Sequence, residues 1–378
     1  MPDEPVIRTD FPGGSGIDFE VGSRDGRTGI AFAADPRGGC EQLWFHWRAE
    51  EVEGTEVLAA LKHLDACLGS TAKWTNHRPV VRGPDGWQRA ESVEVEELPD
   101  GQHWAIWSVP VIDSAAETAL CYPYQRPELE LLVDDCPDLR CDCIGHSQAG
   151  RRLLRLATDY GQVGDPRPGV YLTARQHAGE TPGGWVLDGL WRWLGDHKAA
   201  RKAALWWAVP MVAVDEVVTG CYGKDPHPID CNRAWTRPSM RNEVRTLQLD
   251  MHRWAARCRP GLVVDLHAPG AGESQNYTFL SPIDWMAPTH APIRRLAELY
   301  ERHKPEPLRS ADPVRVAGYP SRWHKEGTIG AWVWRTFGIV GACFETAYAM
   351  SGEHVMDVDD YRRLGASLGA AILDYLKR

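Results

Sequence analysis

A histidine and a glutamate three residues apart, His177 and Glu180, stand in the stretch ARQHAGE at residues 174–180. They follow the apolar run VYLTA, which is typical of a buried strand, and they precede sequence with helical spacing. Residues three apart near a helical turn share a face, so one imidazole and one carboxylate can reach a single ion. The pair alone is a weak signal in a chain with 14 histidines, and a complete site needs a further donor.

Two more candidate residues end apolar runs of the sequence. His267 ends GLVVDLH and is followed by the turn-rich APGAGE, and Glu345 ends IVGACFE. Catalytic zinc usually has three protein ligands and a fourth position for water, so His267 is the best third donor. Open α/β sheets place their ligand sites beyond the carboxyl ends of strands, and we expect all these motifs at that one edge. The alternative for Glu345 is an ordinary surface carboxylate.

The elements that must position these residues change in character at about residue 121. Residues 1–121 contain short β-rich segments such as QLWFHWRAE, ESVEVEEL and HWAIWSVPV, which predict a small antiparallel β-sandwich domain. In residues 122–378, strand-like runs alternate with helix-like stretches, which predicts an α/β catalytic domain with a mixed central sheet flanked by helices. Because no repeat or long flexible linker is found, the two domains are expected to dock closely.

Three helices are expected in the second domain. One has Ser147 as its N-cap and contains QAGRRLLRLATDY, and another carries Val186, Leu190, Trp193 and Leu194 on one face. The last begins after Asp357 or Asp359 and should pack on the sheet through the apolar stripe Tyr361, Leu364, Leu368, Ile372 and Tyr375.

The overall composition restricts the classes of binding partner and the cellular compartment that we expect. A formal net charge of −10 argues against nucleic acid or an anionic membrane as a partner. We expect no secretion signal and no transmembrane helix, because no apolar stretch approaches the roughly 20 residues that span a bilayer. Ten scattered cysteines favour reduced thiols and a cytoplasmic location. A zinc site at Cys136, Cys141 and Cys143 is disfavoured, because paired CxxC units are missing.

Several motifs of the chain, in the right order, resemble one known family. LTARQHAGETPGGWVLDGL mirrors its ITARxHxGE motif and the helix that follows, and DCNRAW resembles its Asp-x-Asn-Arg motif. CYPYQRPELE, GHSQAGRRLLRL, VVDLHAP and KEGTIGAWVWRTFGIVGACFETAY match further segments, and QLWFHW resembles the preceding sandwich. The family is the M14 zinc carboxypeptidases, in the cytosolic carboxypeptidase-like branch, and the resemblance covers nearly the whole chain.

The resemblance implies a metal centre and a hydrolytic mechanism. It implies one zinc ion (Zn2+) per chain, held by His177, Glu180 and His267. Glu345 stands at the position of the general base, which accepts a proton from water and passes it to the leaving amine. Asn232 and Arg233 would hold the free carboxylate of a peptide or small amide substrate, since a guanidinium binds a carboxylate bidentately. The implied activity is hydrolysis of the C-terminal amide bond of peptides.

The chain departs from the family pattern at several places. Gly223 stands where an arginine that stabilises the oxyanion is expected, and the neighbouring Lys224 is the proposed substitute. The familiar Asn-Pro-Asp-Gly segment is replaced by MVAVDEVV. GTIGAW has no arginine after its Gly-Thr pair, where acid-preferring members carry one, which argues against trimming of glutamate chains. Tyr319 lies near the expected position of the active-site tyrosine, without a firm assignment.

Two other functions fit the same residues. A zinc-dependent deacylase of an N-acylated amino acid would use the same ligands and the same carboxylate clamp, but it would demand one acyl group. A catalytically silent zinc-binding relative would keep the fold without turnover, although the presence of every ligand and of the base argues against it. Neither a GxSxG nucleophile motif nor a GxGxxG nucleotide loop occurs. The side-chain preference and the oligomeric state stay open.

Overall fold

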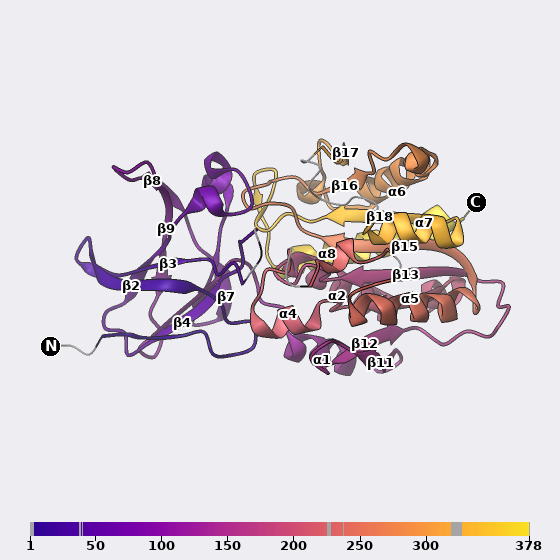
Figure 1. Cartoon of the computed structure of the whole chain (residues 1–378), viewed down its shortest axis with the longest axis horizontal. Helices are drawn as coiled ribbons and strands as arrows, with labels where there is room; N and C mark the ends of the chain where they lie inside the picture. The colour runs from indigo at the N-terminus through magenta and orange to yellow at the C-terminus, as the bar shows by residue number, and fades with distance from the viewer. Residues whose placement is uncertain are drawn as a thin grey trace.

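The strands of the N-terminal third form two five-stranded sheets, drawn in indigo to purple in Figure 1. The structure is a computed structural model that describes residues 4–37, 39, 41–224, 228–236, 238–318 and 327–377. One sheet has the strand order β1 (Val6–Arg8), β4 (His46–Glu50), β10 (Ala115–Ala119), β6 (Val80–Gly83) and β7 (Gly86–Arg89). The other has the order β2 (Ile17–Arg24), β3 (Arg27–Ala33), β5 (Glu56–Leu61), β9 (His103–Pro110) and β8 (Glu94–Glu97).

Aromatic side chains join the two sheets into a sandwich. Phe32 of β3 packs edge-on against Trp47 of β4, with ring centroids 5.4 Å apart, and against Trp107 of β9 at 6.0 Å. All three rings are buried, and such aromatic pairs supply much of the apolar area in a small core. The β-rich N-terminal part that the sequence predicted is therefore present.

One pair of strands differs from the antiparallel pattern that was expected. β3 and β5 run parallel, with Ile30 opposite Ala59. The chain leaves β3 for the other sheet, where it forms β4, and then returns as β5, so it re-enters the first sheet in the same direction. Alternation of apolar residues predicts a strand, but it carries no information about the direction of the neighbouring strand.

The larger part of the chain is built on one mixed eight-stranded sheet. Its order is β11 (Arg140–His146), β12 (Arg152–Ala157), β14 (Leu205–Val209), β13 (Pro168–Ala174), β15 (Arg259–His267), β18 (Val340–Glu345), β16 (Tyr277–Leu280) and β17 (Val314–Val316). The four central strands, β14, β13, β15 and β18, are parallel to one another, whereas β12 and β16 run antiparallel to their central neighbours. The predicted mixed sheet is confirmed.

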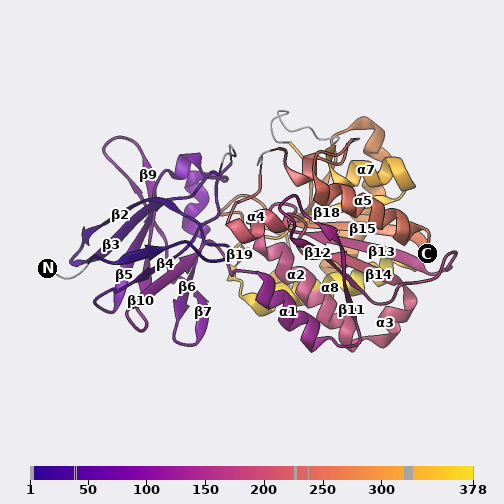
Figure 2. The same ribbon diagram turned by 60° about the horizontal axis from the view of Figure 1, so that its bottom comes forward.

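Helices cover both faces of this sheet. Figure 2 shows α5 (Asn242–Ala255) and α7 (Ile329–Phe337) on one side, and α2 (Thr181–Asp196) and α8 (Val358–Leu376) on the other. The remaining α-helices are α1 (Arg126–Asp135), α3 (Lys198–Ala203), α4 (Val214–Thr219) and α6 (His290–His303). The 3-10 helices are η1 (Leu64–Ala66), η2 (Thr71–Asn76), η3 (Cys231–Arg233), η4 (Asp284–Thr289) and η5 (Glu306–Leu308), and a small ribbon comprises β19 (Met350–Ser351) and β20 (His354–Val355).

Two of the three predicted helices are present, and one is wrong. The side chain of Asp357 caps α8 by accepting a hydrogen bond from the backbone N–H of Asp360, and the apolar stripe of α8 is buried. Helix α2 also forms as expected. The segment after Ser147 is instead the strand β12, paired with β11 and β14. Because β12 lies between two strands and is buried from Leu153 to Ala157, its apolar run has no one-sided pattern to separate strand from helix.

The sandwich and the larger part of the chain dock closely, as expected. Arg89 of β7 lies half-buried at their contact, where its guanidinium donates hydrogen bonds to the carbonyl oxygens of Met356 and Tyr348 and to the hydroxyl of Tyr361. Its cation also lies 4.5 Å from the ring centroid of Tyr122. In the described ranges, no helix is long and apolar enough to cross a bilayer.

Candidate active site

The candidate residues meet at the carboxyl edge of the central sheet. His177 follows β13 by three residues, His267 is the last residue of β15, and Glu345 is the last residue of β18. His267 and Glu345 are register partners across the parallel pair β15 and β18. The expectation that these motifs share one sheet edge is therefore confirmed, while the chemical role of each residue stays a prediction.

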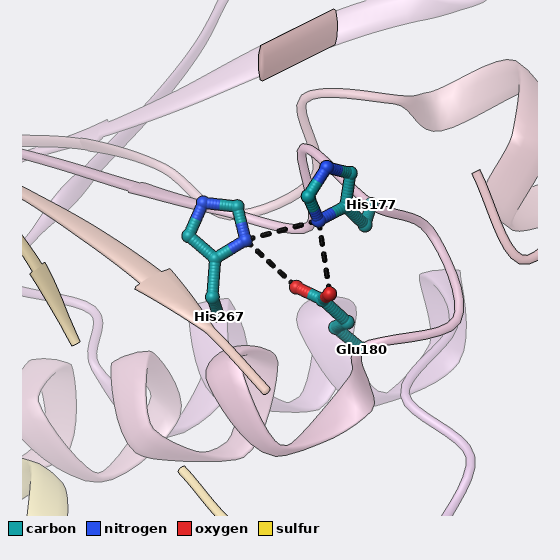
Figure 3. A group of neighbouring side chains, drawn as sticks. All are labelled: His177, Glu180 and His267. Carbon is teal, nitrogen blue, oxygen red and sulfur yellow. Dashed lines mark hydrogen bonds and ion pairs between the residues drawn. The ribbon is translucent and has the colours of Figure 1, made fainter. Parts of the chain in front are cut away.

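The side chains of His177, Glu180 and His267 form a tight buried cluster (Figure 3). Nδ1 of His177 lies 2.9 Å from one carboxylate oxygen of Glu180, and Nδ1 of His267 lies 2.7 Å from the other. The two Nδ1 atoms are 3.2 Å apart. Two imidazole nitrogens and a carboxylate that point at one another are a donor set that zinc prefers. Elsewhere in the described residues, no other group of three His, Cys, Asp or Glu has this geometry.

Each histidine of the cluster is backed by a second carboxylate. Nε2 of His177 lies 3.0 Å from Asp230, and Nε2 of His267 lies 2.6 Å from Asp265. A carboxylate can only accept, so each Nε2 donates its proton outward; Nδ1 of each ring faces Glu180, and with a metal bound it would offer its lone pair to that metal. Burial lowers the pKa of both imidazoles, but the surrounding carboxylates outweigh it and hold both pKa values above the usual range. The same negative field favours a divalent cation, so the residues fit the expected metal.

The two backing carboxylates were not assigned a role from the sequence. Asp265 stands two residues before His267 in a strand, and alternate residues of a strand face the same side, so VVDLH contains the signal that could have found it. Thr173 and Gln176 donate hydrogen bonds to Asp265 at 2.7 and 2.6 Å. Asp230 begins the DCNRAW motif and accepts a hydrogen bond from the backbone of Asn232.

Lys224 lies against the cluster formed by His177, Glu180 and His267. Its ammonium is 3.2 Å from Glu180, and the attraction of Glu180, Glu345 and Glu41 outweighs burial and raises the pKa of Lys224. The pKa of Glu180 is well below its usual range, because the neighbouring cationic groups outweigh its burial. Gly223 has φ near +89°, and a Cβ there would lie 2.5 Å from the backbone nitrogen of Ala178. A side chain at position 223 would therefore strain this backbone.

Glu345 is buried beside the cluster and has an oxygen with no assigned partner. Its Oε2 makes no hydrogen bond to any described residue, and its Oε1 lies 3.7 Å from the sulfur of Cys343. Burial is the largest cause of a raised pKa for this carboxyl, and the charge of Glu180 adds to it. A buried carboxyl group with a raised pKa and an open oxygen is suited to accept and release a proton.

Asn232 and Arg233 both reach the cavity in front of the cluster. Asn232 is held in place because its Oδ1 accepts a hydrogen bond from the backbone N–H of Ile329. Arg233 donates to the carbonyl of Asn232 at 2.9 Å, and its side chain also lines the cavity. The structure thus brings both proposed carboxylate-binding groups within the same hollow as Glu345.

The cavity itself has a volume of about 290 Å³. Tyr277, the antiparallel register partner of Glu345, also lines it, and this tyrosine was not predicted from the sequence. Glu41 and Leu68 of the N-terminal part contribute to the wall as well, so the site is not confined to the α/β part. Tyr319, the candidate active-site tyrosine, lies outside the described residues.

Comparison with solved structures defines the fold. A metallo-carboxypeptidase from Burkholderia cenocepacia matches with a TM-score of 0.78 over 98% of both chains, at 19% identity. A metallo-carboxypeptidase from Pseudomonas aeruginosa, in complex with (2-guanidinoethylmercapto)succinic acid, matches with a TM-score of 0.75 at 20% identity, over 98% of this chain and 100% of that one. The protein therefore has the metallocarboxypeptidase fold.

Sequence comparison finds curated relatives that match part of the chain. Cytosolic carboxypeptidase 6 of Mus musculus is 28% identical over 139 residues, which cover 34% of this chain and 26% of the mouse protein. The matched region thus spans about a quarter of that relative's length. No protein-family model matches the chain. The chain is thus similar in part of its sequence to cytosolic carboxypeptidases and shares the metallocarboxypeptidase fold, in line with the resemblance that the sequence motifs carry.

Proposed function

We propose that this protein is a zinc-dependent metallocarboxypeptidase that hydrolyses the C-terminal amide bond of peptides. The observation that carries the proposal is the cluster of His177, Glu180 and His267, which opens into the same cavity as Glu345 and Arg233. A metal centre, a proton carrier and a carboxylate-binding cation in one hollow are the parts that exopeptidase chemistry requires. The similarity to cytosolic carboxypeptidases supports the same activity and a cytoplasmic location.

The metal would be held by the two histidines and the glutamate of the cluster. When bound, zinc supplies a Lewis acid that polarises a carbonyl oxygen and lowers the pKa of a water molecule. Asp230 and Asp265 orient the ligand imidazoles through their Nε2 protons, which fixes the tautomer that leaves Nδ1 for the metal.

Glu345 carries out the proton transfers in this proposal. Its carboxylate oxygen Oε2 accepts the proton of the attacking water and then delivers that proton to the nitrogen of the leaving amine, so the carboxylate is restored at the end of the cycle. Lys224 supplies a positive charge beside Glu180 that stabilises negative charge developing on the scissile carbonyl oxygen.

Arg233 and Asn232 position the substrate. The guanidinium of Arg233 pairs with the C-terminal carboxylate, and the amide of Asn232, already fixed by the backbone of Ile329, adds a hydrogen bond. This clamp restricts the enzyme to the last residue of the chain and holds the scissile amide near Glu345.

The experiment that tests this function compares peptides with free and amidated C-termini on the zinc-loaded protein. We expect hydrolysis of free-acid peptides and very slow hydrolysis of amidated ones. Arg233→Ala should weaken turnover of free-acid peptides by about 2 to 5 kcal/mol, the range for breaking a desolvated charge pair. Arg253→Ala, on the exposed face of α5, is the control and should have no effect. Equal cleavage of amidated and free peptides would exclude an exopeptidase.

The deacylase alternative is separated by varying the substrate upstream of the scissile bond. An N-acylated amino acid would satisfy the same clamp and the same metal, so the carboxylate experiment alone does not exclude it. A carboxypeptidase should accept varied residues on the N-terminal side of the scissile bond, whereas a deacylase should accept one acyl group there. A protein that binds zinc but turns over neither kind of substrate would be a silent relative.

A further inference from the structure

Arg175 is a buried arginine at the start of the loop that carries His177 and leads to Glu180. It directly follows the last residue of β13, and only 1% of its surface is exposed. Its Nε donates a hydrogen bond to the carbonyl oxygen of Ala178, and its Nη1 donates one to the carbonyl oxygen of Tyr124, both at 2.6 Å. Hydrogen bonds from a charged donor are roughly twice as strong as neutral ones. The guanidinium therefore ties the backbone between the two candidate ligands to the segment that precedes α1.

The backbone of Arg175 has a left-handed conformation, with φ near +60°. This conformation is unfavourable for a residue with a Cβ, and it persists only where surrounding contacts hold it. The carbonyl oxygen of Arg175 accepts a hydrogen bond from the backbone N–H of Ala213 at 3.0 Å, and the side chain adds its two bonds to carbonyl oxygens. These bonds therefore hold a strained turn just before His177.

The loop at residues 177–179 belongs to no helix or strand, unlike the other positions of the cluster. His267 ends β15, which is paired with a strand on each side, and Glu180 is the N-cap residue of α2 (Figure 3). Loops move more than the elements that they connect. The position of His177 therefore depends on a few backbone anchors, and the bond from Arg175 to the loop is one of them.

Tyr124 anchors both this loop and the helix that follows it. Its carbonyl oxygen accepts the hydrogen bond from Arg175, and its buried ring packs edge-on against Trp185 near the start of α2, with ring centroids 4.9 Å apart. A Cβ on Gly184 would lie 2.9 Å from the same ring, so α2 sits directly on it. Arg175 thereby connects the loop to the residue on which α2 and its N-cap residue Glu180 are seated.

We propose that Arg175 is a positioning residue of the metal centre, whose guanidinium holds His177 and Glu180 close enough to share one ion. The inference rests on the proposed function, because the ion is the expected zinc. Nδ1 of His177 lies 2.9 Å from the carboxylate of Glu180, and Arg175 acts on this pair through the carbonyl of Ala178. Ligands that are already held in place lose less freedom when they bind, which raises affinity.

The first test measures the affinity of the metal-free chain for zinc, in competition with a chromophoric chelator. Arg175→Met keeps a long side chain in the interior but cannot donate to the two carbonyl oxygens. Its Kd for zinc should rise by about 10- to 100-fold, the range for groups that orient metal ligands. The control is Arg362→Met, which removes a hydrogen bond from α8 to Asp188 of α2. It loosens the packing of α2 away from the loop, so its Kd should stay at the wild-type value.

A second variant separates the guanidinium from the strained turn. Glycine adopts a positive φ without strain, so Arg175→Gly keeps the turn and removes only the side chain. We expect it to bind zinc as weakly as Arg175→Met. It also keeps the test open if the methionine variant does not fold, because it places no new side chain in the interior. Wild-type affinity in Arg175→Gly would show that the turn alone positions the loop and would overturn the proposal.

Cobalt(II) bound in place of zinc gives an absorption spectrum that depends on the geometry of its ligands. The spectrum should change in both Arg175 variants and stay the same in Arg362→Met, whereas a mere loss of stability would lower the thermal midpoint and leave the spectrum unchanged. Weaker zinc binding by the Arg175 variants of a chain that cleaves no peptide would support the role of Arg175 and reject only the carboxypeptidase. An unchanged Kd and spectrum in a chain that cleaves peptides would overturn only the role of Arg175. A wild-type chain that binds no zinc would overturn both.

Discussion

At the scale of single residues, Glu345 separates an enzyme from a metal-binding relative. Glu345 lies beside the cluster of His177, Glu180 and His267 but is not part of it. Its Oε2 makes no hydrogen bond to any described residue. Glu345→Gln keeps the shape of the side chain and removes its ability to accept a proton. We expect kcat to fall by about 10²- to 10⁴-fold, with zinc content and thermal midpoint nearly unchanged.

The comparison variant for this prediction is His267→Ala, which should release most of the zinc because it removes one of three ligands. Elemental analysis, a thermal melt and a single-turnover rate on the same preparations decide the outcome. Loss of zinc in Glu345→Gln would make Glu345 a ligand and overturn the assigned roles. Full activity in that variant would place the base on another residue.

Single residues also show how far the sequence could predict the site. The donors His177, Glu180 and His267 were found because each ends or follows an apolar run, and strand ends of a parallel sheet meet at one edge. Asp230 was missed, since its contact with His177 joins segments 53 positions apart along the chain. The place of Lys224 depends on the left-handed backbone at Gly223, which sequence spacing alone does not specify.

At the scale of elements, the spacing of apolar residues predicted those helices that bury one face. It failed for a segment that is buried on both faces. Helix α8 has a one-sided stripe and a capping aspartate, so its start and its buried face could be predicted. Strand β12 has apolar residues on both sides, and a run of this kind suits a helix or a strand equally. The parallel pairing of β3 with β5 depends on an intervening strand in the other sheet.

The close contact between α7 and β18 supports the cavity wall and the proposed carboxylate-binding residue Asn232. A Cβ at position 341 would collide with the backbone of Gly330, so Gly341→Ala must displace α7. That shift would also disturb the hydrogen bond from Ile329 to Asn232. We expect a loss of about 1 to 3 kcal/mol of stability, typical of overpacking, together with a raised KM for free-acid peptides.

Gly22→Ala on β2 is the matched control for this variant. A Cβ there meets no atom within 4 Å, so its thermal midpoint and KM should stay close to the wild type. Denaturant unfolding and steady-state kinetics on the two variants measure the effect. A Gly341→Ala protein as stable as the control, with an unchanged KM, would show that α7 adjusts without cost and that the clamp does not depend on this contact.

At the scale of the whole molecule, the N-terminal sandwich is part of the site's construction. Gly69 forms a bridge with Ala271, in the loop that follows His267, and a Cβ at position 69 would lie 2.7 Å from the carbonyl oxygen of Ala271. Arg89 holds the backbone of Tyr348, three residues after Glu345. The sandwich therefore supports the two segments that follow the candidate metal ligand His267 and the candidate base Glu345, and its unfolding should disturb both.

This dependence makes His77, buried where the sandwich faces Tyr348, a source of acid sensitivity for the whole chain. Its Nε2 donates to the carbonyl of Leu120 at 3.1 Å, its ring lies 6.2 Å from that of Tyr348, and burial, assisted by the charges of Arg89 and Arg78, lowers its pKa to about 3. The unfolded chain binds a proton there at about pH 6.5, which the folded chain does not. Stability should therefore fall as the pH drops from about 6.5 towards 3.

The contribution of His77 in that window should be about 1.4 kcal/mol per pH unit, because one more proton is bound by the unfolded chain. His77→Gln can keep the donor to Leu120 but cannot titrate, so its free energy of unfolding should depend less steeply on pH by that amount. Urea unfolding at pH 7, 6 and 5, with a chelator present so that metal release does not contribute, measures the slope. His146→Gln, on the exposed side of β11, should keep the wild-type slope. Equal slopes in His77→Gln and wild type would show that His77 is not the group that protonates on unfolding.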